Sequence, residues 1–183
     1  MLCLGLVVEG IYDEAAITEF VRKSTAPDVR VICRPCGNAI QLMKKFPAFL
    51  NEFQYAKDGA RVDKALVIRD ADRKNPAELI ARMEARIINR RYPFSRSLLV
   101  AVEELESWLL ADEQALSAVT GRSVRRILDP EKLTDPKNIL RNILSDKIAY
   151  TPEVARKIAA AARLDILAAR CRSFRTFQDA IVN

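Results

Sequence analysis

The sequence predicts an α/β fold in which a mostly parallel sheet of about four strands, flanked by helices, precedes an all-helical C-terminal third. In the first two-thirds of the chain, short β-branched apolar runs alternate with helical spacing of apolar residues, a pattern that is typical of βαβ units. From Leu105 onward only helical spacing remains, and it is interrupted by Gly121, Pro130, Pro136 and Pro152. The expected architecture is therefore Rossmann-like.

The four expected strands are apolar almost throughout, as is usual for strands that are covered on both faces. They span residues 2–8, 29–33, 64–69 and 97–102. The segments between them carry apolar residues at helical spacing, which predicts helices over residues 13–23 and 38–53. A third helix begins at Pro76, because proline fits the first helical position, and runs to about residue 91.

Length and composition predict one domain. The chain has 183 residues, of which 50% are apolar, and it contains no Pro-rich or Gly-rich linker. We expect an α/β core over residues 1–112 and a helical extension over residues 113–183 that packs on it. No apolar run is long enough to span a membrane, and the N-terminus lacks the pattern of a signal peptide. These features predict a cytoplasmic protein without a membrane partner.

Charge and residue usage narrow the chemistry further. The net charge of +6 and the pI of about 9.3 favour an anionic partner such as nucleic acid. The absence of histidine excludes Ser-His-Asp and Cys-His catalysis and every metal site that needs imidazole.

Cys33 and Cys36 form a CxxC motif after the second strand, which can be interpreted as a redox site or as free thiols. We favour free thiols, because Gly37 stands where a redox helix would already have begun.

Acidic residues follow three of the four expected strands. Glu9 follows the first strand, Asp70 and Asp72 follow the third, and Glu104 and Glu106 follow the fourth. Ligands of open parallel sheets bind at this edge, and clustered carboxylates need cations or raised pKa values. Because an extended backbone has a period of two, Asp70 and Asp72 are expected to point to the same side. The pattern predicts a Mg²⁺ or Mn²⁺ site, with caps at helix N-termini as the alternative interpretation.

Basic residues accompany these acids. Arg82, Arg86 and Arg90 recur every four positions, so that one continuous helix would carry them as a positive stripe. Arg73 and Lys74 follow the third strand directly. Contacts of these side chains to phosphates would give binding that depends on salt and not on base sequence. The alternative is an ordinary solvated helix face.

Trp108, further along the chain, is interpreted as a core residue.

Three sets of motifs carry a family resemblance. The sequence VEG at residues 8–10, followed by DAD at 70–72, resembles the glutamate and DxD motifs of TOPRIM domains. Nearly the whole chain resembles the DUF4276 family of small TOPRIM-like proteins. That resemblance rests on AVEELESWLLAD at residues 101–112, DPK at 135–137 and SF at 173–174.

The resemblance implies a TOPRIM fold related to the nuclease half of overcoming-lysogenisation-defect (OLD) enzymes, which cut DNA with divalent metals. The chain has no GxxxxGK[ST] segment, so an ATPase partner would be a separate protein in a defence or mobile-element system. The serine-x-glutamate motif of OLD enzymes is replaced here by Glu104-Leu105-Glu106, of which Glu106 is the favoured third acid and Glu104 its companion. Lys137 resembles the catalytic lysine of those nucleases. Proline at position 136 predicts an extended Asp135 and a turn that directs Lys137 toward the acids.

The sequence thus predicts a divalent-metal-dependent endonuclease that acts on nucleic acid, with DNA as the expected substrate and a homodimer as one option. The expected catalytic residues are Glu9, Asp70, Asp72, Glu106 and Lys137. The expected metal ligands are Glu9, Asp70, Asp72, Glu104 and Glu106, and the expected nucleic-acid contacts are Arg73, Lys74, Arg82, Arg86 and Arg90. Two alternatives stay open: a catalytically silent TOPRIM-like module that binds nucleic acid or an ATPase, and phosphoryl transfer on small molecules.

Overall fold

The computed structural model describes residues 2–25, 27–55, 61–145 and 147–182. Its described strands form one four-stranded parallel sheet in the order β2-β1-β3-β4. The strands are β1 (Cys3–Val8), β2 (Arg30–Pro35), β3 (Lys64–Asp70) and β4 (Ser95–Ala101). The predicted α/β fold is confirmed, and each observed strand boundary lies within two residues of its predicted position.

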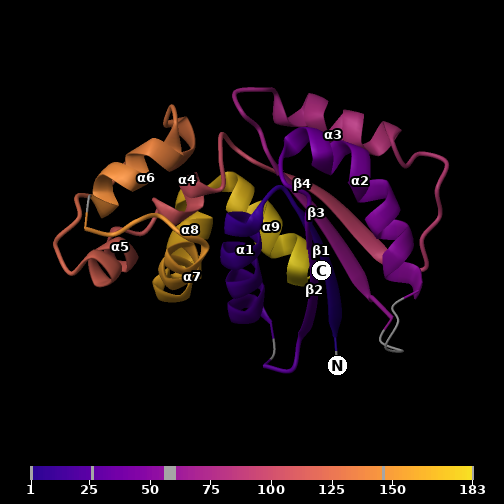
Figure 1. Ribbon diagram of the computed structural model, residues 1–183, viewed down its shortest axis with the longest axis horizontal. Helices are drawn as coiled ribbons and strands as arrows, with labels where there is room; N and C mark the ends of the chain where they lie inside the picture. The colour runs from indigo at the N-terminus through magenta and orange to yellow at the C-terminus, as the bar shows by residue number, and fades with distance from the viewer. Residues whose placement is uncertain (1, 26, 56–60, 146, 183) are drawn as a thin grey trace.

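Helices cover both faces of the sheet (Figure 1). Successive side chains of a strand point to opposite faces. Leu6 and Ile68 accordingly belong to the core on the side of α1 (Ile11–Ser24). Val7 and Val67 belong to the core on the other side, under α2 (Ala39–Glu52) and α3 (Pro76–Ala85). Continuous apolar strands are therefore explained by burial on two faces.

The described C-terminal part is helical, as predicted. It contains the helices α4 (Glu106–Leu109), α5 (Glu113–Thr120), α6 (Pro136–Leu144), α7 (Pro152–Ala161), α8 (Leu164–Arg170) and α9 (Arg172–Val182), besides short 3-10 turns at Phe53–Tyr55 and Pro130–Lys132. Helices α7, α8 and α9 lie beside α1, and α5 and α6 lie farther from it (Figure 1). Residues of all these helices join the core that α1 covers. Trp108 is only 1% exposed and packs against Phe20, Phe174 and Phe177. Its interpretation as a core residue is confirmed.

Helix α3 is shorter than predicted. It ends at Ala85 rather than near residue 91, and Arg86 forms its C-terminal cap. The chain turns there because Ile87 enters the core under α2, where it joins Met83 and Phe94. Arg90 therefore lies outside the helix, and the prediction of one helical stripe of three arginines was wrong.

The segment before Lys137 also differs from the prediction. Asp135 is not extended, because its φ of 57° and ψ of 62° are left-handed, a conformation that aspartate adopts more readily than most residues. Its side chain accepts a hydrogen bond from the Asn138 amide and caps α6. Lys137 consequently lies in the first turn of α6 and not in a loop.

No helix among the described residues is long and apolar enough to cross a membrane.

Candidate active site at the carboxyl edge of the sheet

The candidate site lies where β1 and β3 end next to each other. From β1 the chain moves to β2 on one side, whereas β3 is followed by β4 on the other side. Such a reversal of strand order is the usual position of ligand sites in open parallel sheets. A hollow of about 620 Å³ opens at this point. The residues that line it include Glu9, Tyr12, Asp13, Asp70 and Lys137.

Glu9 and Asp70 are held together by backbone hydrogen bonds. The amide of Asp70 donates to Glu9 Oε1 at 3.0 Å, and the amide of Leu105 donates to Asp70 Oδ1 at 2.9 Å. Strand β1 thus positions the carboxylate of Glu9, and strand β3 positions that of Asp70. The segment after β4 fixes the orientation of the Asp70 carboxylate. The prediction that acids at different strand ends approach each other is confirmed for this pair.

Glu106 and Lys137 reach the same region from the C-terminal helices. Glu106, the first residue of α4, has a side chain that is only 3% exposed. Its Oε1 accepts a hydrogen bond from Tyr150 at 3.1 Å and lies 3.4 Å from Lys137 Nζ. The ammonium group also stands over the ring of Tyr12, 5.1 Å from its centroid. Although burial disfavours the charged ammonium, Glu106 raises the pKa of Lys137 above its ordinary value.

Asp13 is a member of the site that sequence reasoning did not assign. Its Oδ2 accepts a hydrogen bond from the Gly10 amide at 2.7 Å, a contact that is usual for an acid three residues after the N-cap. Burial, followed by the charges of Glu106 and Glu9, raises its pKa to about 7. Sequence reasoning could have found Asp13 from its spacing. It lies four residues before Ile17 and so continues the buried stripe of α1 toward the N-terminus.

We call Glu9, Asp13, Asp70 and Glu106 the acidic edge. Burial raises the pKa of Asp70 well above its ordinary value, and the charges of Asp13 and Glu9 act in the same direction. Burial also raises the pKa of Glu9, although the hydrogen bond from the Asp70 amide opposes the shift. For Glu9, Asp13 and Asp70, either protonation or a bound cation would relieve the mutual repulsion.

Asp72 does not continue the extended backbone of Asp70, so the prediction of one strand through both residues was wrong, although the charge of Asp72 still acts on Glu9 and Asp70. Strand β3 ends at Asp70, and the backbone becomes left-handed at Asp72 and Arg73, with φ of 48° and 64°. The turn forms because the Asp72 amide donates to the Glu103 carbonyl at 3.0 Å, which ties the ends of β3 and β4 together. The exposed Asp72 lines a second hollow of about 330 Å³ with Glu103 and Asp135.

Glu104 holds the start of α6. Its Oε2 accepts a hydrogen bond from the Lys137 amide at 2.9 Å, which satisfies one of the free amides of a helix N-terminus. Burial raises the pKa of Glu104 above its ordinary value. The described contact therefore gives Glu104 a positioning role, since it fixes the backbone from which the Lys137 side chain extends.

The predicted basic residues do not line one common hollow. Arg82, Arg86 and Arg90 are exposed, but only Arg82 lies within α3. Arg73 lines the hollow beside Asp72. Lys74 and Arg86 line a different hollow, which they share with the buried Arg69. The pairing of Lys74 with Arg86 could not be read from periodicity, because it depends on how α3 packs beside β4.

The chemistry of the acidic edge matches a hard divalent cation, although no cage is assembled there. Among the described residues, no group of three or more Cys, Asp or Glu side chains is arranged so that it could hold a metal ion. Mg²⁺, however, is commonly held by one or two carboxylates, with water and substrate phosphates as the remaining ligands. Within the described residues, Glu9 Oε2 and Asp70 Oδ2 have no hydrogen bond, so both oxygens can serve as such ligands.

The cysteines beside the site are free thiols, as expected. Burial raises the pKa of Cys33, and it raises the pKa of Cys36 to about 11. A thiol that stays protonated at neutral pH is a poor nucleophile. The two thiols therefore do not have the character of a redox site.

The chain matches a known protein family. The model of the family described as "Domain of unknown function (DUF4276)" matches residues 8–181, and the chain belongs to this family. No curated protein and no solved structure matches the chain.

Proposed function

We propose that this member of the DUF4276 family is a divalent-metal-dependent nuclease that hydrolyses phosphodiester bonds of nucleic acid, with DNA as the substrate. The observation that carries the proposal is the meeting of Glu9, Asp70, Asp13 and Lys137 around one hollow at the point where the strand order reverses. The resemblance of the segments at residues 8–10 and 70–72 to the TOPRIM motifs supports the same activity.

Glu9 and Asp70 are the residues that would hold the metal. A bound divalent ion would neutralise charge on the phosphate and lower the pKa of a bound water. The chain contributes the orientation of both carboxylates through the amides of Asp70 and Leu105. Preorganised groups of this kind need little rearrangement during the reaction.

Asp13 and Lys137 supply the groups that act on protons and on charge. Because its pKa is about 7, Asp13 can accept or donate a proton near neutral pH, which is the property of a general acid or base. Lys137 lines the same hollow and carries a positive charge toward an entering phosphate. Glu106 and Tyr12 hold its ammonium group in place, so Glu106 acts here as a positioning residue.

The net charge favours a polymer over a small phosphorylated molecule. A chain with a charge of +6 attracts the many phosphates of a strand. A separate ATPase partner, a role in defence, a homodimer and a cytoplasmic location remain predictions from the resemblance and the composition.

A nuclease assay with the Asp70→Asn variant tests the proposal. The purified chain should cleave DNA in the presence of Mg²⁺ or Mn²⁺, and the variant should fall to background. Asparagine keeps the oxygen that accepts the Leu105 amide but removes the charge, so the fold should persist. Asp179→Asn, which changes an exposed acid of α9, is the matched control and should cleave as the unaltered chain does.

Thermal melting provides a second measurement. A metal that binds only the folded state raises its stability by about 2.7 kcal/mol at a hundredfold excess over its dissociation constant. The melting temperature should rise with Mn²⁺ in the unaltered chain and in Asp179→Asn, but not in Asp70→Asn. Strand binding without cleavage under all metal conditions would instead support the catalytically silent module.

A further inference from the structure

Another hollow, of about 290 Å³ and separate from the two described above, lies between α2 and α3, and its charged lining residues are all positive. Its described lining residues are Ala39, Ile40, Met43, Lys44, Arg69, Lys74 and Arg86. We call it the cationic hollow. Lys44, Lys74 and Arg86 are exposed, and no acidic residue is among the described lining residues. Glu9, which lies outside the lining, is 3.9 Å from Arg69 Nε. The four cations of the lining outnumber this acid, so an anion entering the cationic hollow would reduce the repulsion among them.

Arg69 connects the cationic hollow to the acidic edge. Its side chain is only 5% exposed, its Nε donates to the Asp70 carbonyl at 3.2 Å, and the same Nε lies 3.9 Å from Glu9 Oε1. Within the described residues, its two terminal nitrogens have no hydrogen bond, and they are not among the side-chain atoms that are sealed from solvent without a partner. Its place in the lining leaves these donors open to the hollow, where a phosphate can accept from them.

The alternation of β3 explains why the two hollows are neighbours. Side chains at positions 66 and 68 face α1, and those at 65 and 67 face α2 and α3. Continuing this alternation, Asp70 turns toward the side of Asp13 and Arg69 toward the side of the cationic hollow. Adjacent residues of one strand therefore serve a carboxylate site and a cationic site on the two sides of the same edge.

We propose that the cationic hollow binds a phosphate of the nucleic-acid strand, next to the phosphate that lies at the acidic edge. The inference rests on the proposed function, and it adds Arg69 and Lys44 to the substrate contacts. Arginine donates its planar fork of N–H groups to phosphate oxygens, and the exposed lysines add point charges. A strand bound at both places would cross the edge of the sheet between β1 and β3.

The apolar lining of the cationic hollow suits a nucleotide more than a free anion. Ile40 is 68% exposed, and Met43 lies one helical turn further along α2. Such side chains can pack against a sugar or a base, whereas a free inorganic anion gains nothing from them. Charge and apolar surface together match one nucleotide of a strand.

The test measures binding separately from hydrolysis. In the Asp70→Asn background, which blocks the proposed reaction, the affinity for a short fluorescent single-stranded DNA is measured by anisotropy at several salt concentrations. The triple variant Lys44→Ala, Lys74→Ala, Arg86→Ala should bind roughly tenfold or more weakly. Its salt dependence should fall by a slope of about 0.7 for each lost phosphate contact. The three side chains are exposed, so their truncation should leave the fold intact.

A matched triple variant controls for net charge. Lys132→Ala, Arg141→Ala, Lys157→Ala removes three exposed cations of the C-terminal part, from the 3-10 turn at Pro130–Lys132, α6 and α7, and should keep both the affinity and the slope. Equal losses in the two triple variants, or no binding by the parent chain, would overturn the inference. Competition by a free mononucleotide as strong as by the strand would also overturn it, since the ligand would then be a small molecule.

The nuclease assay separates this inference from the proposed function. If the unaltered chain binds DNA through the cationic hollow but never cleaves it, the nuclease proposal fails and the inference stands. If the chain cleaves DNA and the triple variant of the cationic hollow cleaves equally well, the inference fails and the nuclease proposal stands.

Discussion

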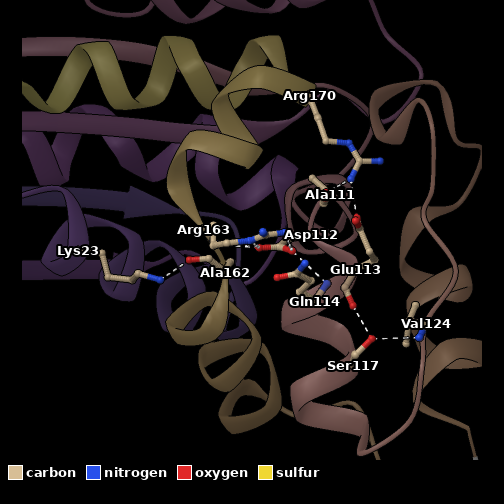
Figure 2. Close-up of polar contacts among 10 residues, drawn as sticks. All are labelled: Lys23, Ala111, Asp112, Glu113, Gln114, Ser117, Val124, Ala162, Arg163 and Arg170. Carbon is tan, nitrogen blue, oxygen red and sulfur yellow. Dashed lines mark hydrogen bonds and ion pairs between the residues drawn. The ribbon is translucent and has the colours of Figure 1, made fainter.

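Two groups of buried and half-buried acids in this molecule have opposite surroundings. At the acidic edge, Asp70 accepts one described hydrogen bond, from the Leu105 amide. Asp112, in the turn between α4 and α5, accepts bonds from the Gln114 amide and from the Arg163 amide and guanidinium (Figure 2). Nearby, Arg170 pairs with Glu113 at 2.9 Å. We call Asp112, Glu113, Arg163 and Arg170 the Asp112 cluster.

The pKa values of the two aspartates move in opposite directions as a result. Burial raises the pKa of Asp70 well above its ordinary value, and neighbouring acids add to the shift. Burial acts on Asp112 in the same direction, but hydrogen bonds from Arg163 and Gln114 outweigh it and lower its pKa to about 2. This difference indicates that burial alone does not identify a functional acid. A buried acid whose charge is unmatched is the better candidate.

The largest expected difference between the two regions is in turnover. Lys137→Ala should lower turnover by roughly 10²–10³, the usual effect of removing a group that stabilises the transition state. Arg163→Ala removes the corresponding cation of the Asp112 cluster, so it should lower the melting temperature and leave the turnover per folded molecule unchanged. Parallel nuclease assays and thermal melts measure both effects. Full turnover in Lys137→Ala would remove this residue from the proposed site.

The pH dependence of stability should differ in sign. A carboxyl whose pKa is raised in the folded state stabilises the fold at low pH, and this contribution is lost as pH rises through the folded value. For Asp13 the window runs from its ordinary 3.8 to about 7. The melting temperature should therefore fall over this window, and Asp13→Asn should flatten the decline. Asp112, whose folded pKa is about 2, acts oppositely, because its contribution is lost as pH falls through that value.

Thermal melts across this pH range, with Asp179→Asn as the control, check the assignment. An unchanged slope in Asp13→Asn would mean that other groups cause the decline.

The smallest expected effect concerns the helix cap in the Asp112 cluster. Asp112 is the N-cap of α5, and its side chain accepts the Gln114 amide. Loss of the cap in Asp112→Ala should cost about 1 kcal/mol, which corresponds to roughly 2–4 °C in a chain of this size. Removal of the contacts to Arg163 should add to that loss. A melting temperature equal to that of the unaltered chain would show that the cluster is not a stabilising feature.

The sheet and the meeting of Glu9 with Asp70 could be predicted because they depend on local patterns and one general rule. Apolar β-branched runs specify strands, helical spacing between them specifies parallel pairing, and parallel strands bring their carboxyl ends to one edge. The wrong positions of Asp72 and Arg90 have a different origin. The hydrogen bond between Asp72 and Glu103 ends the strand period before Asp72, and the burial of Ile87 ends the helical period before Arg90. Neither interruption can be seen in the spacing of residues along the sequence.

By itself, the sequence determined the α/β order of elements and which acids end the strands, since both follow from spacing along the chain. Only the tertiary structure decided which charges lack a partner, because that depends on contacts between distant segments. Packing brought Lys137 to Glu106, buried Asp13 beside them, and surrounded Asp112 with the donors of Arg163. Asp13 and Asp112 are the same residue type near helix starts, and their different electrostatic surroundings arise from the folded chain around them.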